Sequence, residues 1–122
     1  MLPKSQRLRL PQDFTATVRS GARTGRRNVV LYARVRENDP QGNNRFGFIV
    51  SKAVGNAVHR NLVKRRMRAL AAQIPANANG LDFVFRALPG SAEIVWEELN
   101  QQVSSGLVSV VGKAGAKHEK GL

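Results

Sequence analysis

The stretch from Lys52 to Arg68, KAVGNAVHRNLVKRRMR, decides most about this chain, because it places a glycine turn directly before a strongly basic helix. Six of its 17 residues are Lys or Arg, and no Asp or Glu occurs from residue 40 to residue 80. A solvated helix normally interleaves both signs of charge, so a helix of one sign repels itself unless a polyanion supplies the opposite charge. The stretch therefore predicts a helix that binds a polyanion, and nucleic acid is the expected one.

The polar residues of this helix share one side. At about 100° per residue, an arc of roughly 140° contains Arg60, Lys64, Ala57, Arg68, Asn61 and Arg65. Arg forks onto phosphate oxygens and Lys acts as a point charge, while Asn offers a donor and an acceptor to a 2′-hydroxyl or a base edge. These groups predict RNA binding, and the alternative is a solvated basic helix without a specific ligand.

The basic surface is built by the first two thirds of the chain. Twenty Lys and Arg against 8 Asp and Glu give a formal net charge of +12. Residues 1–81 hold 16 basic and 3 acidic side chains, whereas residues 82–122 hold 4 and 5. A chain of 122 residues with 42% hydrophobic content can close one modest core, so we expect a single domain over 1–122. Its ordered core is expected over about 8–108, with flexible termini at 1–7 and 112–122.

Composition also limits the chemistry. The chain has no Cys, and its 2 His and 8 carboxylates offer little for a metal site, so we expect no metal and no cofactor bound by the protein itself. No apolar run approaches the roughly 18 residues that a bilayer span needs, and the N-terminus lacks the apolar region of a signal peptide. The expected location is cytoplasmic, with no membrane partner and no obligate protein partner.

Hydrophobic periodicity predicts an α+β sandwich of helices packed against a small sheet, in the order α-β-β-α-β-α. Helices are expected at about 12–19, from just after Asn56 to about 73, and from Ser91 onward. Strands are expected at 28–36, 45–52 and 81–86, and residues 20–27 are interpreted as a connector. Turn formers at 38–44 predict that the first two strands pair as a hairpin.

The basic stretch also carries a family resemblance. It is similar to the signature of the bacterial ribonuclease P protein subunit, roughly K-x-x-G-x-A-V-x-R-N-x-x-K-R-x-x-R. The matching positions are Lys52, Gly55, Ala57, Val58, Arg60, Asn61, Lys64, Arg65 and Arg68. Nine matches at fixed spacing are far more specific than a basic cluster alone. The resemblance covers about residues 5–105, and it departs from the family's pattern at Ala69, where Glu is common.

The resemblance implies a fold and a role. The fold would include a short extra strand near Ser51 and a left-handed β-α-β crossover around the basic helix, where sequence pattern alone favours a right-handed connection. The role would be that of an RNA-binding subunit that assists a catalytic RNA in endonucleolytic removal of the 5′ leader from precursor tRNA. The implied partners are the ribonuclease P catalytic RNA and precursor tRNA. Catalysis would reside in the RNA, which requires Mg²⁺, and no residue of the protein would be catalytic.

Two groups of residues are assigned on this basis. Contacts with the RNA subunit and the nearby substrate are assigned to Lys52, Arg60, Asn61, Lys64, Arg65 and Arg68. In the family, an aromatic cleft between the first helix and the sheet holds the leader, and Phe14, Tyr32 and Arg34 are assigned to it. Strand alternation alone leaves open whether Tyr32 is a stacking platform or a partly buried residue with a wet hydroxyl. The family often has a second Phe four residues after the first, where this chain has Val18.

The sequence also bears on two other possible functions. The carboxylates of the basic region are scattered singly, and His59 and His118 lie far apart in the sequence. Two-metal cleavage needs clustered carboxylates and metal-free cleavage usually needs paired histidines, so a free-standing nuclease is disfavoured. The alternative is a small basic ribosomal or ribosome-assembly protein, for which the same size and charge are ordinary.

Overall fold

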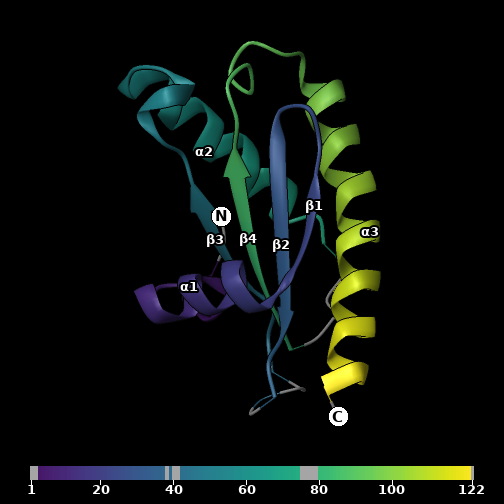
Figure 1. Cartoon of the computed structure of the whole chain (residues 1–122). Helices are drawn as coiled ribbons and strands as arrows, with labels where there is room; N and C mark the ends of the chain where they lie inside the picture. The colour runs from purple at the N-terminus through teal and green to yellow at the C-terminus, as the bar shows by residue number, and fades with distance from the viewer. Residues whose placement is uncertain (1–2, 38, 40–41, 75–79, 122) are drawn as a thin grey trace.

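The computed structural model describes residues 3–37, 39, 42–74 and 80–121, and their centre is a four-stranded mixed sheet. The strands lie in the order β1 (Ala22–Gly25), β2 (Val29–Val35), β4 (Leu81–Ala87) and β3 (Arg45–Ile49). Strand β2 is antiparallel to both of its neighbours, β1 and β4, whereas β3 runs parallel to β4. Helix α1 (Pro11–Ser20) covers one face and α3 (Trp96–Gly121) covers the other (Figure 1).

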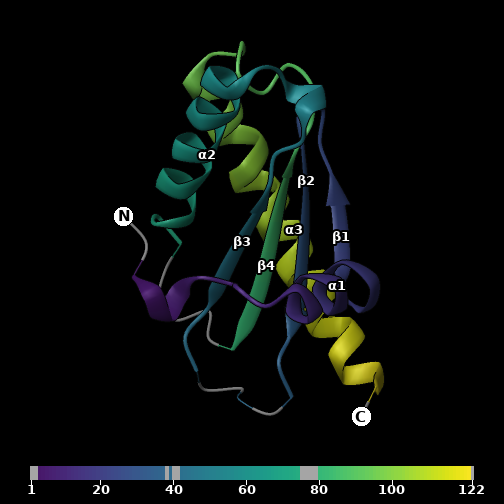
Figure 2. The ribbon, with the colours of Figure 1, turned by 90° about the vertical axis from the view of Figure 1, so that its left-hand side faces the viewer.

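The basic helix α2 (Ala57–Ala71) connects the two parallel strands. Its buried residues Val63 and Met67 belong to the same core cluster as Leu99 and Val103 of α3, so α2 returns on the α3 side of the sheet. In Figure 2, α1 lies in front of the sheet and α3 behind it, both strands run upward, and β4 lies to the right of β3. The crossover is therefore left-handed, as the resemblance implied, although right-handed connections dominate in proteins generally.

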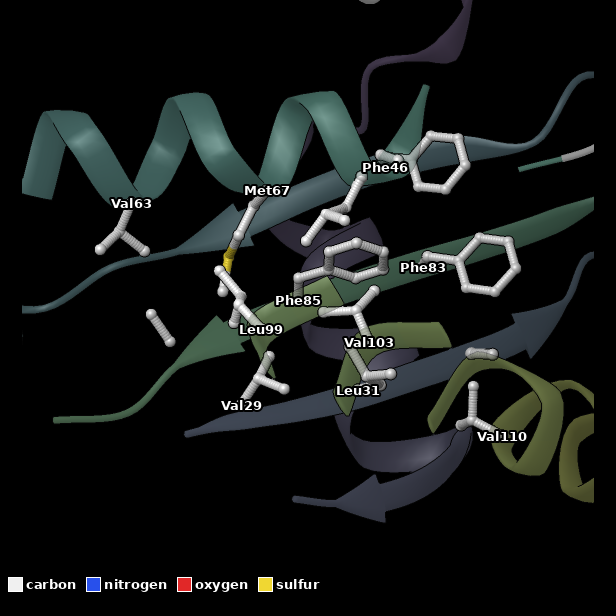
Figure 3. Close-up of a cluster of buried hydrophobic side chains, with 14 of the residues drawn as sticks. Val29, Leu31, Phe46, Val63, Met67, Phe83, Phe85, Leu99, Val103 and Val110 are labelled. Carbon is white, nitrogen blue, oxygen red and sulfur yellow. The ribbon is translucent and has the colours of Figure 1, made fainter. Parts of the chain in front are cut away.

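The larger core lies between the sheet, α2 and α3 (Figure 3). Phe46 stacks on Phe83 with ring centroids 5.1 Å apart and planes 7° from parallel, and Phe48 meets Phe85 edge-on at 5.6 Å. Met67 reaches the sheet from α2 and is fully buried. Because each large apolar side chain stabilises the fold by about 1.5–3 kcal/mol when it is fully buried, this face supplies most of the apolar stabilisation.

A smaller cluster lies on the α1 side of the sheet. Its buried members are Leu8, Val30, Tyr32 and Val84, and Phe14, Val18, Ile49 and Leu88 pack against them. The N-terminal segment is attached here, because the backbone N–H of Leu8 donates to the carbonyl of Phe46 at 2.9 Å and Arg7 forms a parallel bridge with the same residue. Flexibility was expected for 1–7, whereas residues 3–7 contain this bridge and the short helix η1 (Lys4–Gln6). Residues 1–2 lie outside the described residues.

The C-terminal residues differ from their expectation of disorder, because α3 continues through Gly121. Val110 and Ala114 are buried in the larger core, and Gly106 lets the helix approach Leu31. Near its end, Lys113 and Lys117 donate to backbone carbonyls of Arg23 and Gly21 at 3.2 Å each. Glycine disfavours helix formation, so packing against β1 stabilises this glycine-rich end of α3. None of the described helices has the length and apolar content of a membrane span.

Three expectations about the sheet need correction. The predicted hairpin of the strands at 28–36 and 45–52 is wrong, because β4 lies between β2 and β3 and pairs with both. The extra strand near Ser51 is replaced by a short helix, η2 (Lys52–Val54). The fourth strand is β1, in the segment interpreted as a connector. The last helix also begins at Trp96, because residues 91–94 form a turn in place of its expected first turn.

Candidate nucleic-acid interface

Gly55 of the signature and the residue that follows it, Asn56, initiate α2. Gly55 has φ +148°, a conformation that residues with a Cβ rarely adopt, and a Cβ there would also crowd His59. Asn56 is the N-cap, and its side-chain oxygen accepts a hydrogen bond from the backbone N–H of His59 at 3.1 Å. This bond satisfies one of the helix's orphan donors. Gly55 and Asn56 therefore have structural roles, because they set where the basic helix begins and the direction in which it runs.

The polar side of α2 faces solvent. Asn61, Arg65 and Arg68 are exposed, while Arg60 and Lys64 are partly buried. Lys52 is exposed on η2, directly before the turn that leads into the helix. Among the residues that the structure describes, no cation of this set pairs with a carboxylate. We call the set Lys52, Arg60, Asn61, Lys64, Arg65 and Arg68 the α2 arc.

Arg66 has a different role from its neighbour Arg65. Its guanidinium Nη1 donates to the backbone carbonyls of Ile94 at 2.8 Å and Ser91 at 3.3 Å, so it ties α2 to the turn before α3. The same side of α2 buries Val63 and Met67. Sequence reasoning assigned no role to Arg66, because the helical period places it outside the polar arc, between the two apolar flanks of the helix. The position of Arg66 on the helix could not predict its bonds to the carbonyls of Ser91 and Ile94, because these residues are distant in the sequence.

The structure brings the three residues of the expected leader cleft to one surface. Phe14 on α1 is partly buried, and its ring lies on Gly47 of β3, where any Cβ would collide with it. Tyr32 packs in the same cluster and is only 5% exposed. Arg34 follows on the same strand face, with 29% of its side chain exposed. We call these residues, Phe14, Tyr32 and Arg34, the α1 face.

The exposure of the two aromatic rings decides between the two interpretations of Tyr32. A base stacks only on a ring face that solvent can reach, and the ring of Tyr32 is covered. Its burial favours a packing role, with the ring as the floor of the α1 face. Phe14 is the aromatic residue of this face that retains accessible surface. Val18 packs against the same cluster where the family often has a second Phe.

A buried carboxylate organises the arginines beside the α1 face. Asp82 is 0% exposed and accepts hydrogen bonds from Arg45 Nε and Nη2 at 2.8 Å each, from Arg36 Nη1 at 2.7 Å and from Arg34 Nη2 at 3.3 Å. Burial by itself would raise the pKa of Asp82, but the hydrogen bonds from Arg45 and Arg36 outweigh it and hold the pKa below its usual value. The hydrogen bond to Asp82 likewise raises the pKa of Arg45. Sequence reasoning treated Asp82 only as an isolated carboxylate.

Comparison with known proteins places the chain in a family. The sequence model of the family described as Ribonuclease P matches residues 2–111. The chain belongs to the ribonuclease P protein family. A ribonuclease P protein component from Pseudarthrobacter chlorophenolicus is 48% identical over 122 residues, which cover 98% of this chain and 88% of the relative. Another from Kocuria rhizophila is 49% identical over 112 residues, with 91% and 96% covered.

A solved structure agrees in fold. The RNase P protein of Staphylococcus aureus, solved at 2.0 angstrom, matches with a TM-score of 0.74 at 24% identity, over 85% of this chain and 94% of that chain. Membership of the ribonuclease P family gives the chain a role in ribonuclease P and in tRNA processing. A ribosomal or ribosome-assembly role is therefore not favoured. Within the described ranges, no three His, Asp or Glu side chains gather as metal ligands.

Proposed function

We propose that this member of the ribonuclease P family binds two RNAs at once. The α2 arc binds the catalytic RNA and the nearby part of the substrate, and the α1 face binds the 5′ leader of precursor tRNA. Hydrolysis of the phosphodiester bond is assigned to the catalytic RNA, which requires Mg²⁺, and the protein supplies binding and positioning. The observation that carries the proposal is the set of cations on α2 that lack a carboxylate partner among the described residues.

The contrast between two groups of arginines supports this assignment. Arg36 and Arg45 direct their guanidinium groups to Asp82, so much of their charge is neutralised within the protein. Arg65 and Arg68 are exposed and form no such pair with the residues that the structure describes. Repulsion among cations on one helix side is relieved when phosphates bind there, and the counterions released from the RNA add to the affinity. The α2 arc thus has the charge and the exposure of a phosphate-binding surface.

The α1 face suits a single strand. Such sites combine a charged path for the backbone with an aromatic ring on which a base stacks. Phe14 offers the accessible ring, Tyr32 supports it from below, and Arg34 keeps 29% of its side chain exposed beside them. A leader that crosses Phe14 would therefore meet both a stacking surface and a cation.

Charge neutralisation explains how the protein would assist an RNA enzyme. Two large RNAs repel each other as they dock, and divalent cations normally reduce that repulsion. A basic protein that contacts both RNAs neutralises some of their phosphates and so reduces the same repulsion. We therefore expect the protein to lower the Mg²⁺ concentration that the catalytic RNA requires.

Reconstitution tests the proposal. The protein alone, the cognate catalytic RNA alone and the mixture are each incubated with precursor tRNA at low millimolar Mg²⁺, and release of the leader is measured. We expect cleavage by the mixture, none by the protein alone, and cleavage by the RNA alone only at higher Mg²⁺. Cleavage by the protein alone, or a mixture no faster than the RNA alone across the Mg²⁺ series, would overturn the proposal.

A further inference from the structure

A second basic surface lies beside the α1 face. It is a groove of about 460 Å³ between the N-terminal segment, the start of α1 and β3, lined by Lys4, Ser5, Arg7, Arg9, Leu10, Asp13 and Arg45. We call it the N-terminal groove. Figure 2 shows the N-terminal segment crossing the sheet on the α1 side and leading directly into α1. The groove therefore shares a face with Phe14 and is distinct from the α2 arc.

The walls of the groove are fixed in place. Leu8 is buried, and its N–H bond to Phe46 anchors the segment that carries Lys4 and Arg9 to β3. On the other side, the carbonyl of Leu10 accepts from the backbone N–H groups of Asp13 and Phe14 at 3.0 and 3.2 Å, so the groove continues without a break into α1. Lys4 and Arg9 are exposed, and their charges can reach a ligand in the groove.

Arg45 supplies the inner wall. Its guanidinium is held by Asp82 at 2.8 Å through two nitrogens and lies 3.5 Å from Asp13, yet 28% of the side chain remains exposed. Asp13, the acidic residue of the groove, faces Arg45, whose charge is also balanced by Asp82. The excess positive charge of the groove therefore comes from its other basic residues, among them the exposed Lys4 and Arg9. The excess of positive charge therefore favours an anion, and the elongated path from η1 to Phe14 favours a polymer of phosphates.

We propose that the N-terminal groove is a further RNA-phosphate site, which holds the sugar-phosphate backbone of the strand that crosses Phe14. The proposal rests on the proposed function, because it extends the leader path from the α1 face to Lys4, Arg9 and Arg45. Its ligand is RNA phosphate, which can come from upstream leader nucleotides or from the catalytic RNA. We assign it to the leader, because the groove and Phe14 lie on the same face.

The test removes two charges that no described fold contact needs. The variant carries Lys4→Gln and Arg9→Gln, and the control carries Arg23→Gln and Arg27→Gln, which remove the same charge from exposed positions outside the groove. Affinity of the reconstituted holoenzyme is measured from 50 to 200 mM salt for mature tRNA and for precursor tRNA with a long or a shortened leader. Binding of each protein to the catalytic RNA without substrate is measured in parallel.

If two phosphates are contacted, the slope of log affinity against log salt becomes shallower by about 1.4–1.8 for the long leader. The ratio of the unmodified protein's affinity to the groove variant's affinity then falls by about 7- to 12-fold between 50 and 200 mM salt. The affinity for mature tRNA is the same for both proteins. Loss of the effect with a shortened leader supports the leader as the source. The same change in binding to the catalytic RNA alone supports that RNA as the source and overturns the leader assignment. Slopes equal to those of the control with every RNA overturn the site.

Failure of this site can be told apart from failure of the proposed function. Binding of the purified protein to a single-stranded oligoribonucleotide reports on the groove without any cleavage. If the groove variant binds this probe like the control while the mixture still cleaves precursor tRNA, the groove proposal fails alone. If the mixture cleaves no better than the RNA alone, the proposed function fails whatever the probe shows.

Discussion

Asp82 on β4, which is fully buried, and Arg45 on β3, which is partly exposed, form a bidentate pair across the parallel register of their strands, with both nitrogen–oxygen distances at 2.8 Å. Arg34 of β2 and Arg36, the residue directly after β2, reach the same carboxylate from the other side of β4. One acidic side chain therefore joins the three strands that carry the α1 face. It also fixes the directions in which Arg34 and Arg45 point.

Removal of this carboxylate should destabilise the fold strongly. Asp82→Ala leaves the guanidinium groups that surround it without their common partner, and breaking a buried pair typically costs about 3–5 kcal/mol. Asp39→Ala is the matched control, because Asp39 is 61% exposed and lies 3.7 Å from Arg36, and exposed pairs contribute about 0–1 kcal/mol. Urea denaturation of both variants measures the difference. Equal, small losses for the two would show that the Asp82 cluster does not hold the sheet.

The same carboxylate predicts a loss of stability in acid. The pKa of Asp82 is lower in the folded protein than in the unfolded chain, where it lies near 3.9. Its contribution is therefore fully present above about pH 4 and is lost as the pH falls through the folded pKa. Urea midpoints at pH 7, 5 and 3 should fall mainly in the last interval. In Asp82→Asn this part of the fall should disappear, and an unchanged pH profile in that variant would contradict the assignment.

Arg65 and Arg66 are neighbours in sequence and should respond oppositely to substitution. Arg65→Ala should weaken binding to the catalytic RNA while stability changes by less than about 0.5 kcal/mol, because the side chain is exposed. Arg66→Ala should lower stability by about 1–3 kcal/mol, because it removes the donor for two backbone carbonyls. Thermal melts and RNA titrations on the same samples compare the two. A stability loss confined to Arg65→Ala would reverse these roles.

Phe14 tests leader stacking independently of α2. Phe14→Ala should weaken holoenzyme binding to precursor tRNA by about 1–3 kcal/mol if one base stacks on the ring, and leave mature tRNA unchanged. Phe14→Leu keeps apolar contact with Gly47 but lacks the aromatic face, so it should show most of the same loss. If the leucine variant binds precursor tRNA like the unmodified protein, packing alone explains Phe14.

Tyr32 provides the contrasting case on the same face. Because the ring is almost completely buried, Tyr32→Ala should destabilise the protein by about 3–5 kcal/mol, the range for large aromatic side chains in cores. Tyr32→Phe keeps the ring and should retain most of the stability and most of the precursor affinity. Melting curves measured beside the binding assays separate the two effects. A Tyr32→Ala protein of normal stability that loses only precursor affinity would restore the stacking interpretation.

Local signals in the sequence predicted some elements well. Helix α2 was found because Gly55 and Asn56 form its start and the basic run fills one side, and β4 was found because Leu81, Phe83 and Phe85 alternate. The turn formers at 38–44 indicated that the chain reverses, but they carry no information about which strand comes between. The insertion of β4 between β2 and β3 is decided by distant residues, so the hairpin prediction failed.

Other features depended on packing that no local pattern encodes. Strand β1 has only four residues, and its inward Ala22 and Thr24 are buried under α3. The end of α3 is rich in glycine, yet Val110 and Ala114 find partners in the core. The α2 arc could be predicted because exposure follows from the helical period. The grouping of Asp82 with Arg34, Arg36 and Arg45 could not, because it needs the strand order.

Crosslinking of the assembled holoenzyme tests most directly whether two surfaces bind two RNAs. Photoreactive uridines are placed either in the leader of precursor tRNA or in the catalytic RNA, and the crosslinked peptides are identified by mass spectrometry. The account predicts that leader uridines crosslink to peptides containing Phe14 or Arg34, and that catalytic-RNA uridines crosslink to the peptides of residues 57–71. Leader crosslinks confined to α2 or α3, or catalytic-RNA crosslinks confined to the α1 face, would contradict it.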